Sequence, residues 1–227
     1  MGKGQALIFL GPSLSHEKAR RVLPDAEYLR PARKGDLAGL IAKRRNVDSP
    51  LLVGLVDGVF LQDYPPTPIE VYQLAVQPNI TLVGSSSLGA LRAVELEKFG
   101  MVGIGRVFNL FKGGKLDADD EVAVTFNEGD FGLLSEAMID IRYNLFLAYK
   151  KGFIDSKARS ALTRTAKQTY FPHRSYSYII EETSRYYPDQ RPSFEAFGNY
   201  IARNRKSLKE KDAYRLLEYV KTVMNQD

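Results

Sequence analysis

Apolar residues in the first half of the chain form short, nearly continuous runs, and segments with helical spacing separate these runs. Such runs are typical of strands that are buried on both faces of a parallel sheet. They predict strands over residues 6–10, 51–60, 80–84 and 121–126. The segments between them predict helices over 15–23 and 36–44, one starting at Thr67 with a capping box to Glu70, and one over 87–99. Alternating strands and helices indicate an α/β fold, a mainly parallel, Rossmann-like sheet with flanking helices.

The second half of the chain carries helical patterns throughout. A first helix is expected over residues 135–152, capped by Ser135 and ended by Gly152. Further helices are expected near residues 155–168, 175–186, 193–205 and 208–224. The last pattern begins with a capping box from Ser207 to Glu210. We therefore predict two domains, an α/β core over residues 1–127 and a C-terminal α-helical subdomain over 128–227.

The composition excludes several kinds of chemistry. There is no cysteine among the 227 residues, so disulfides, thiolate–zinc sites and persulfide relays on this chain are excluded. The chain has two histidines, His16 and His173, which provide few ligands for a transition-metal site. We expect neither a metal nor a cofactor. No apolar run is long enough to span a bilayer, so we expect a cytoplasmic protein without a membrane partner.

The net charge of +5 is unevenly distributed. Residues 51–127 hold five basic and nine acidic side chains, so the middle of the chain is acidic. Proteins that bind nucleic acids usually concentrate positive charge at their working surface. We therefore expect no nucleic-acid partner, and the basic flanks face either an acidic protein or solvent.

Unusual residues follow three of the predicted strands. These are Gly11-Pro12-Ser13, Asp57-Gly58 and Gly84-Ser85-Ser86-Ser87. Ligands of open α/β sheets lie outside the carboxyl ends of the strands, so we expect Ser13, Asp57 and Ser86 to line one cleft. The Asp57 carboxylate either lies at the mouth of the sheet or forms a turn with its own backbone.

The serine run is the sharpest of these signals. A strand, three small hydroxyl residues and a helix place backbone N–H groups where an anion or oxyanion can bind. With Ser87 as the reference, residues 85–89 resemble a nucleophile elbow in which Ser85 replaces the first glycine. A serine triad also needs a histidine base, and only His16 and His173 are present. The alternative is that Ser86 or Ser87 simply caps the helix.

An ion pair is predicted on the helix after the serines. Helical spacing places Arg92 and Glu95 on the face that also carries Leu88 and Leu91. Burying one charge alone there is costly, so the two side chains should bond each other or a ligand. The alternatives are an ion pair that joins helix to sheet and a functional pair near the serines.

Three further features are less specific signals. Acidic residues including Asp119 and Asp120 could hold Mg²⁺ or form a solvated turn. Gly103-Ile104-Gly105 lacks the third glycine of a dinucleotide-binding fingerprint and is a weak signal. The aromatic tract over residues 170–182 with Arg174 is either a partner surface or helix packing.

Several motifs together resemble the TfuA family. They occur in the same order and extend over most of residues 6–126, and the block from Gly84 to Val124 is the most specific part. The motifs are GPSL at 11–14, PARKGDL at 31–37, VDGVF at 56–60, GSSSLGALRAVEL at 84–96, FGMVGIGRVF at 99–108 and ADDEVAV at 118–124.

The resemblance implies an accessory role in the thioamidation of a peptide backbone. The expected partner is a YcaO-type enzyme, which uses ATP to activate a backbone amide that then accepts sulfide. TfuA-like proteins are thought to release the sulfide by hydrolysing a thiocarboxylated carrier of the ThiS type, and to improve engagement of the peptide. The peptide would belong to the biosynthesis of a ribosomal peptide natural product or to methyl-coenzyme M reductase.

Two functions from different classes follow for this chain. The first is a thiocarboxylate hydrolase, whose nucleophile is Ser87 or a water held by Asp57 or Glu95. Its candidate catalytic residues are Asp57, Ser86, Ser87, Arg92 and Glu95, and its candidate binding residues are Gly11, Pro12, Ser13, Gly84, Ser85, Asp119 and Asp120. The second is a non-catalytic adaptor that docks on the YcaO partner and presents peptide or carrier. The acidic, serine-rich sheet mouth favours the first, and the basic, aromatic helical half favours the second.

Overall fold

The computed structural model describes residues 5–44, 49–59 and 63–225. They form two compact units. The first contains the chain up to Asp117 together with the segment from Lys209 onward, and the second runs from Ala118 to Leu208.

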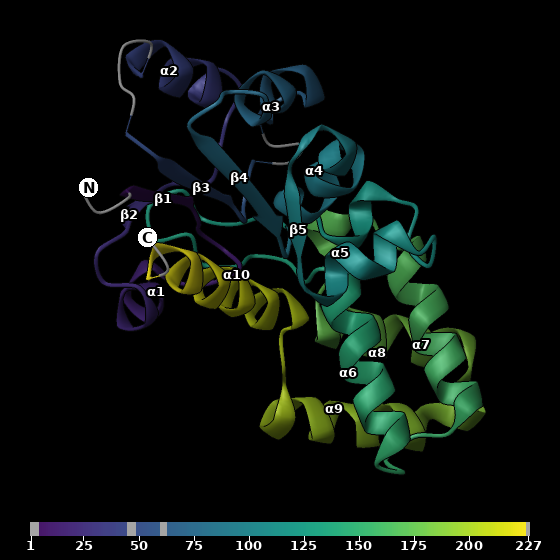
Figure 1. The fold of residues 1–227 in the computed structure, drawn as a ribbon. Coiled ribbons are helices and arrows are strands. Elements are labelled where there is room, and N and C mark those ends of the chain that lie inside the picture. The colour runs from purple at the N-terminus through teal and green to yellow at the C-terminus, as the bar shows by residue number, and fades with distance from the viewer. Residues whose placement is uncertain (1–4, 45–48, 60–62, 226–227) are drawn as a thin grey trace. The chain divides into compact units, whose positions relative to one another are not determined.

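A parallel sheet of five strands forms the centre of the first unit (Figure 1). The strands predicted at residues 6–10, 51–60 and 80–84 are neighbours in it, with Phe9 opposite Leu55 and Leu55 opposite Gly84. The predicted α/β fold is confirmed. In sheet order the strands are β2 (Glu27–Leu29), β1 (Gln5–Phe9), β3 (Leu51–Leu55), β4 (Ile80–Ser85) and β5 (Val102–Ile104). The strand order reverses between β1 and β3, which makes their carboxyl ends the expected ligand position.

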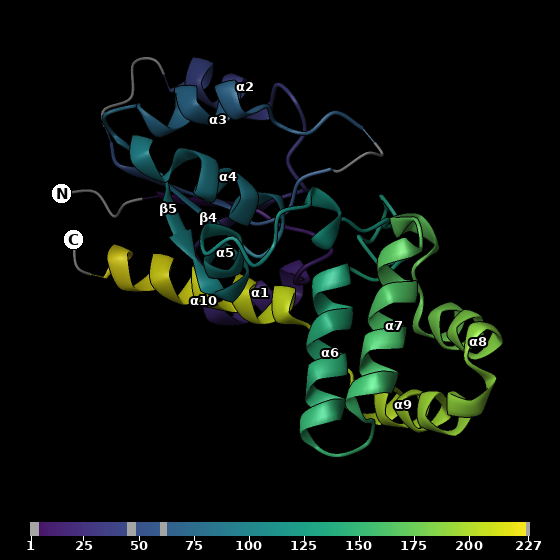
Figure 2. The ribbon, with the colours of Figure 1, turned by 90° about the vertical axis from the view of Figure 1, so that its right-hand side faces the viewer.

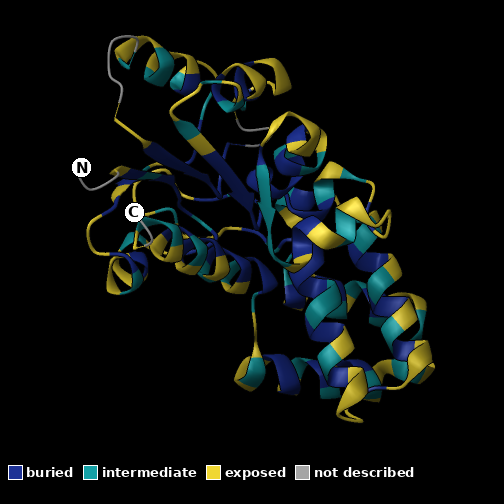
Figure 3. Ribbon diagram, viewed as in Figure 1, coloured by how far each residue is buried: buried dark blue, intermediate teal, exposed yellow. Residues whose placement is uncertain are grey.

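Helices cover both faces of this sheet, as Figures 1 and 2 show. Helices α2, α3 and α4 lie on one face, α1 and α10 lie on the other, and α5 packs beside α4 and β5. Their bounds are α1 (His16–Val22), α2 (Asp36–Lys43), α3 (Pro68–Ala75), α4 (Leu88–Leu96), α5 (Gly105–Lys112) and α10 (Leu208–Met224). The central strand β3 is buried throughout, and β1 and β4 are buried over most of their length (Figure 3).

Some predicted elements of the first half differ from the structure. The edge strands β2 and β5 were not predicted, because three residues are too few to establish a hydrophobic pattern. The strand predicted over 51–60 ends at Leu55, and residue 60 lies outside the described residues. The strand predicted over 121–126 is wrong: η2 (Asp119–Glu121) occupies its start, and Phe126 makes one isolated bridge to Leu133.

The second unit packs four helices around its own apolar core. Phe194, Phe197 and Met138 are among the largest fully buried side chains there. Asp155 and Ser175 accept capping hydrogen bonds from their helices. Ser135 does not cap α6 as predicted, because its hydroxyl accepts the N–H of Thr125 at 2.8 Å and residue 137 holds the N-cap position. The helices are α6 (Met138–Lys150), α7 (Ser156–Gln168), α8 (Tyr176–Tyr186) and α9 (Arg191–Asn204), with short turns η3 (Phe171–His173) and η4 (Pro188–Gln190).

The last helix belongs to the sheet and not to the helical subdomain. Four residues of α10 at helical spacing, Ala213, Leu216, Leu217 and Val220, are fully buried in the core that contains Ile8 and Leu52. The compact units therefore differ from the predicted division at residue 127, which remains a prediction about folding domains. No helix in the described residues is long and apolar enough to cross a bilayer.

A buried carboxylate connects two helices of the first unit. Thr67 caps α3 as predicted and accepts the N–H of Glu70 at 3.2 Å. The Glu70 carboxylate instead accepts the N–H groups of Gly35, Leu37 and Ala38 at 3.0, 2.9 and 3.2 Å. The N-cap residue of α2 is a glycine, so Glu70 provides the cap that its own chain segment lacks.

Replacing Glu70 with alanine should lower the free energy of unfolding by about 2–3 kcal/mol, because three N–H groups at the start of α2, among them the buried one of Leu37, lose their acceptor. Gln73→Ala, an exposed position on the same helix, should change it by about 0.5 kcal/mol or less. Denaturant unfolding measures both. Equal effects of the two substitutions would show that the cap contributes nothing.

Candidate functional site

The carboxylate of Asp57 lies at the carboxyl ends of β1 and β3. It is fully buried, and its Oδ2 accepts the backbone N–H groups of Gly11 and Ser13, each at 2.9 Å. Its Oδ1 accepts the hydroxyl of Ser13 at 2.6 Å. Asp57 thus does not form a turn with its own backbone, because its partners lie more than 40 residues away. The turn Gly11-Pro12-Ser13, whose residues are candidate binding residues, binds this internal carboxylate.

The serine turn after β4 joins this arrangement through one hydroxyl. Ser86 Oγ lies 3.0 Å from Ser13 Oγ, to which it donates. Because Ser13 gives its own proton to Asp57, the three groups form a chain of hydrogen bonds from Ser86 through Ser13 to a carboxylate. Ser13, Asp57 and Ser86 therefore come together as predicted, but all three are buried and do not line an open cleft.

The backbone identifies Ser86 as the residue at the sharp point of the turn. Its φ is 67°, in the left-handed region that residues other than glycine rarely adopt. A strained residue between a strand and a helix is the geometry of a nucleophile elbow, so the match is to Gly84-Ser85-Ser86 and not to a run centred on Ser87. Ser87 holds the N-cap position of α4 without a capping bond, and its hydroxyl makes no hydrogen bond within the described residues.

The close approach of α4 to β3 needs a glycine. A Cβ at Gly89 would lie 1.7 Å from the carbonyl oxygen of Leu55, so no larger residue fits there. The N–H of Gly89 donates to Val56 O at 3.2 Å, and that of Ser87 donates to Ser85 O at 2.8 Å. Two of the amides expected to bind an oxyanion are therefore already committed to carbonyl groups.

Backbone carbonyls of α10 close the serine turn. Ser86 Oγ lies 2.9 Å from Lys209 O. Ser85 Oγ lies 2.9 Å from Asp212 O and 2.8 Å from Ile104 O, and these two carbonyl groups compete for its one proton. Ser85 and Ser86 are fully buried in consequence. Ser86 has one proton, so the bond to Lys209 O competes with the bond to Ser13.

A second internal carboxylate, which was not predicted from the sequence, lies beside the serine turn. Asp212 is fully buried, and its Oδ2 accepts the N–H of Val107 at 2.6 Å at the start of α5. Gly105, at φ 101°, permits this approach, since a Cβ there would lie 2.5 Å from the Asp212 carboxyl carbon. The sequence held one signal for this residue. Asp212 is an acidic residue beside Ala213 and Leu216, on the helix face that is buried. The carboxylate therefore accepts a backbone N–H at the start of α5, where helices commonly bind anions.

Arg92 and Glu95 form the predicted ion pair, but they do not bond the serines. Arg92 Nη1 lies 2.9 and 2.8 Å from the two Glu95 oxygens, and its Nε donates to Pro66 O at 3.2 Å. The Arg92 side chain is 12% exposed and that of Glu95 is 43% exposed. The pair thus ties α4 to the segment before α3, which favours the structural alternative.

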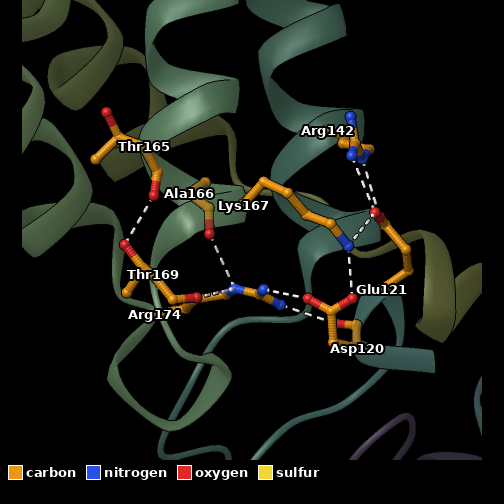
Figure 4. Close-up of polar contacts among 8 residues, drawn as sticks. All are labelled: Asp120, Glu121, Arg142, Thr165, Ala166, Lys167, Thr169 and Arg174. Carbon is orange, nitrogen blue, oxygen red and sulfur yellow. Dashed lines mark hydrogen bonds and ion pairs between the residues drawn. The ribbon is translucent and has the colours of Figure 1, made fainter. Parts of the chain in front are cut away.

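The acidic residues near 120 are paired with cations in the second unit (Figure 4). Asp120 accepts bonds from Lys167 and Arg174, and Glu121 accepts two bonds from Arg142 at 2.9 Å. This environment does not suit Mg²⁺, which needs free carboxylate oxygens, and the described residues contain no group of three metal-binding side chains. Asp119, at the start of η2, is not part of these bonds.

Arg174 is a buried structural residue and not part of a partner surface. Its side chain is 1% exposed. Besides Asp120 it donates to the carbonyl groups of Ala166 and Thr169 at 3.0 and 3.1 Å. Its charge therefore holds the end of α7 against η2 (Figure 4).

Comparison with known proteins gives one match. A family model described as TfuA-like protein matches residues 57–175, more than half of the chain. This range contains Asp57, the serine turn and Arg174, whereas Ser13 and α10 lie outside it. No curated protein matches the chain.

The stability provided by Asp120 should depend on pH. Burial alone would raise the pKa of Asp120, but the hydrogen bonds and charges of Lys167 and Arg174 outweigh it and lower the pKa below 3.8. At pH 7, Asp120→Asn should lower the free energy of unfolding by about 2–4 kcal/mol, because Arg174 keeps a buried charge without its counter-ion. This difference should be fully present above pH 3.8 and lost as pH falls through the lower, folded pKa.

Denaturant unfolding of wild type and Asp120→Asn at several pH values measures this difference. Asp189→Asn, at an exposed position of the same unit, is the control and should run parallel to wild type. A difference that stays constant down to pH 2.5 would contradict the electrostatic explanation.

Proposed function

The chain belongs to the TfuA-like family, which is linked to YcaO-associated processes, and we propose that it releases sulfide for peptide thioamidation in the cytoplasm. It does so by hydrolysing the thiocarboxylate of a ThiS-type carrier beside a YcaO-type enzyme. The modified peptide is a natural-product precursor or methyl-coenzyme M reductase.

The observation that carries this proposal is the chain of hydrogen bonds from Ser86 through Ser13 to Asp57. An activated serine needs a base within hydrogen-bond reach and a third group that orients that base. Ser13 lies 3.0 Å from Ser86 and is held by Asp57 at 2.6 Å. A carboxylate that acts through a second serine replaces the histidine of an ordinary triad.

The bond changes follow from these positions. The Ser86 oxygen attacks the thiocarboxylate carbon while its proton moves to Ser13 and the Ser13 proton moves to Asp57. The carbon–sulfur bond breaks, and the departing sulfur takes the proton back and leaves as HS⁻. Water then cleaves the Ser86 ester. Its oxygen leaves with the acyl group as the carboxylate, one of its protons restores the serine hydroxyl, and the other proton passes to solvent. No cysteine is needed at any step, in keeping with the composition.

Access to Ser86 requires the start of α10 to move. Ser86 is fully buried and shares its proton with Lys209 O at 2.9 Å. Displacing Lys209 breaks this competing bond, directs the Ser86 proton to Ser13 and exposes the oxygen to substrate. Closure by α10 thus keeps the nucleophile inactive until a partner binds.

The burial of Ser86 also supports a second function, a non-catalytic adaptor. In that case the hydrogen bonds among Ser13, Asp57 and Ser86 only stabilise the sheet edge, and the chain presents peptide or carrier to the YcaO enzyme. The two functions differ in one measurable property: an adaptor releases no sulfide from a thiocarboxylated carrier above the rate of the carrier alone.

Substitutions in the relay should separate the roles of the serines. Ser86→Ala should reduce sulfide release to nearly the rate of the carrier alone, because the nucleophile is lost. Ser13→Ala and Asp57→Asn should slow it roughly 10²–10⁴-fold, the usual contribution of general base catalysis. Ser87→Ala should change the rate by about twofold or less, because its hydroxyl is outside the relay. Sulfide is measured over time with a thiocarboxylated carrier and the YcaO partner.

Ser156→Ala, an exposed serine of the second unit, is the matched control and should behave as wild type. All variants should keep the circular dichroism spectrum and bind the partner normally. Loss of activity in Ser87→Ala but not in Ser86→Ala would refute the relay, and absence of release by wild type would refute the hydrolase.

A further inference from the structure

We propose that the basic groove between α6 and α7 binds an acidic segment of a partner protein through arginine charges and an aromatic anchor. We define the basic groove by Arg142, Phe146, Arg159, Thr163, Arg164 and Lys167, all in the second unit. None of these residues belongs to the serine relay, so binding can be tested whether or not the chain releases sulfide.

The basic groove consists of two adjoining hollows. The larger has a volume of about 390 Å³ and is lined by the four cations together with Ser160 and Thr163. The smaller, about 240 Å³, shares Arg142, Arg159 and Thr163 with it and adds Leu145 and Phe146. One end of the groove therefore offers charge and hydroxyl groups, and the other offers apolar surface.

Positive charge dominates this part of the chain. Residues 142–168 contain seven lysines and arginines but one acidic residue, Asp155, which caps α7. Asp120 and Glu121 compensate Arg142 and Lys167 (Figure 4).

Two arginines of the basic groove keep uncompensated charge. In the described residues, neither Arg159 nor Arg164 has a carboxylate partner: Arg159 lies over the ring of Tyr149 at 5.0 Å, and Arg164 donates to the hydroxyl of Tyr187 at 3.3 Å. An acidic ligand would supply the missing partners, whereas a basic one would be repelled.

Aromatic side chains favour a protein ligand over a nucleic acid. Phe146 is 39% exposed beside the smaller hollow, and arginine with aromatic residues is the usual composition of protein interfaces. A single-stranded nucleic acid stacks successive bases on several aromatic rings, whereas Phe146 is the one aromatic side chain among the described residues that lines the two hollows. The Arg159 guanidinium already covers Tyr149, the other exposed aromatic residue on α6.

Fluorescence anisotropy with defined probes tests this assignment. The first probe is a labelled 14-residue helical peptide with leucines along one face and glutamates on the flanks, and the second carries lysines in place of the glutamates. The third is a 15-nucleotide oligouridine. The glutamate peptide should bind at least about tenfold more tightly than the other two probes, and binding should weaken as salt is raised from about 50 to 300 mM.

Variants locate the binding. The double variant Arg159→Glu with Arg164→Glu should weaken binding of the glutamate peptide by about tenfold or more, and Phe146→Ala by about fivefold. Arg203→Glu, at an exposed position on α9, is the matched charge reversal and should leave it unchanged. All variants should keep the helical circular dichroism spectrum of wild type.

Three outcomes would overturn the assignment. They are equal binding of the glutamate and lysine peptides, binding of the glutamate peptide that survives the double variant, and tighter binding of the oligouridine that the double variant removes. Each is independent of the sulfide assay, so failure here leaves the result for Ser86 unchanged.

Discussion

The buried carboxylate of Asp57 is the interaction on which the rest of the sheet edge depends. An ionised carboxylate without partners costs several kcal/mol to bury, so the surrounding chain must provide donors. Two backbone amides and the Ser13 hydroxyl do so, which fixes the turn after β1 to the end of β3 at the reversal of strand order. Ser13 is then held where its oxygen can accept from Ser86. One charge thus determines the position of three strand ends.

Buried carboxylates that accept backbone N–H groups recur along this edge of the sheet. Asp57 fills the turn after β1, Glu70 binds the amides at the start of α2, which follows β2, and Asp212 binds an amide of α5, which follows β5. These are positions where α/β proteins commonly bind anionic ligands. The turn after β4 differs, because it presents serine hydroxyls that donate to carbonyl groups of α10. It is therefore the turn where a substrate can compete for donors without displacing a bound carboxylate.

Sequence patterns predicted the parts of the fold that depend on continuous hydrophobic burial. Strands β1, β3 and β4 and most helices were found because each buries a regular apolar pattern, and three strand ends with small or acidic residues were enough to bring Ser13, Asp57 and Ser86 together. The packing partner of α10 could not be predicted, because its buried apolar face, Ala213 to Val220, could pack equally well on a sheet or on other helices. The roles of Asp212 and Arg174 were missed for a related reason. Their partners lie far away in the sequence, and spacing gives no information about contacts at that distance.

The start of α10 connects the proposed partner-binding role of the second unit with the proposed catalytic role of Ser86, because one continuous backbone segment contacts both. Its first residue, Leu208, donates its N–H to Asp140 of the second unit at 2.6 Å, whereas the carbonyl of the next residue, Lys209, accepts from Ser86. One peptide bond therefore separates a contact of the helical unit from the bond that occupies the candidate nucleophile. Under the proposed function, a partner that binds the helical unit and disturbs the bond to Asp140 would change the constraint on Lys209, and with it the competition for the Ser86 proton. Partner binding and catalysis then need not be alternatives, because the first can relieve the closure that prevents the second.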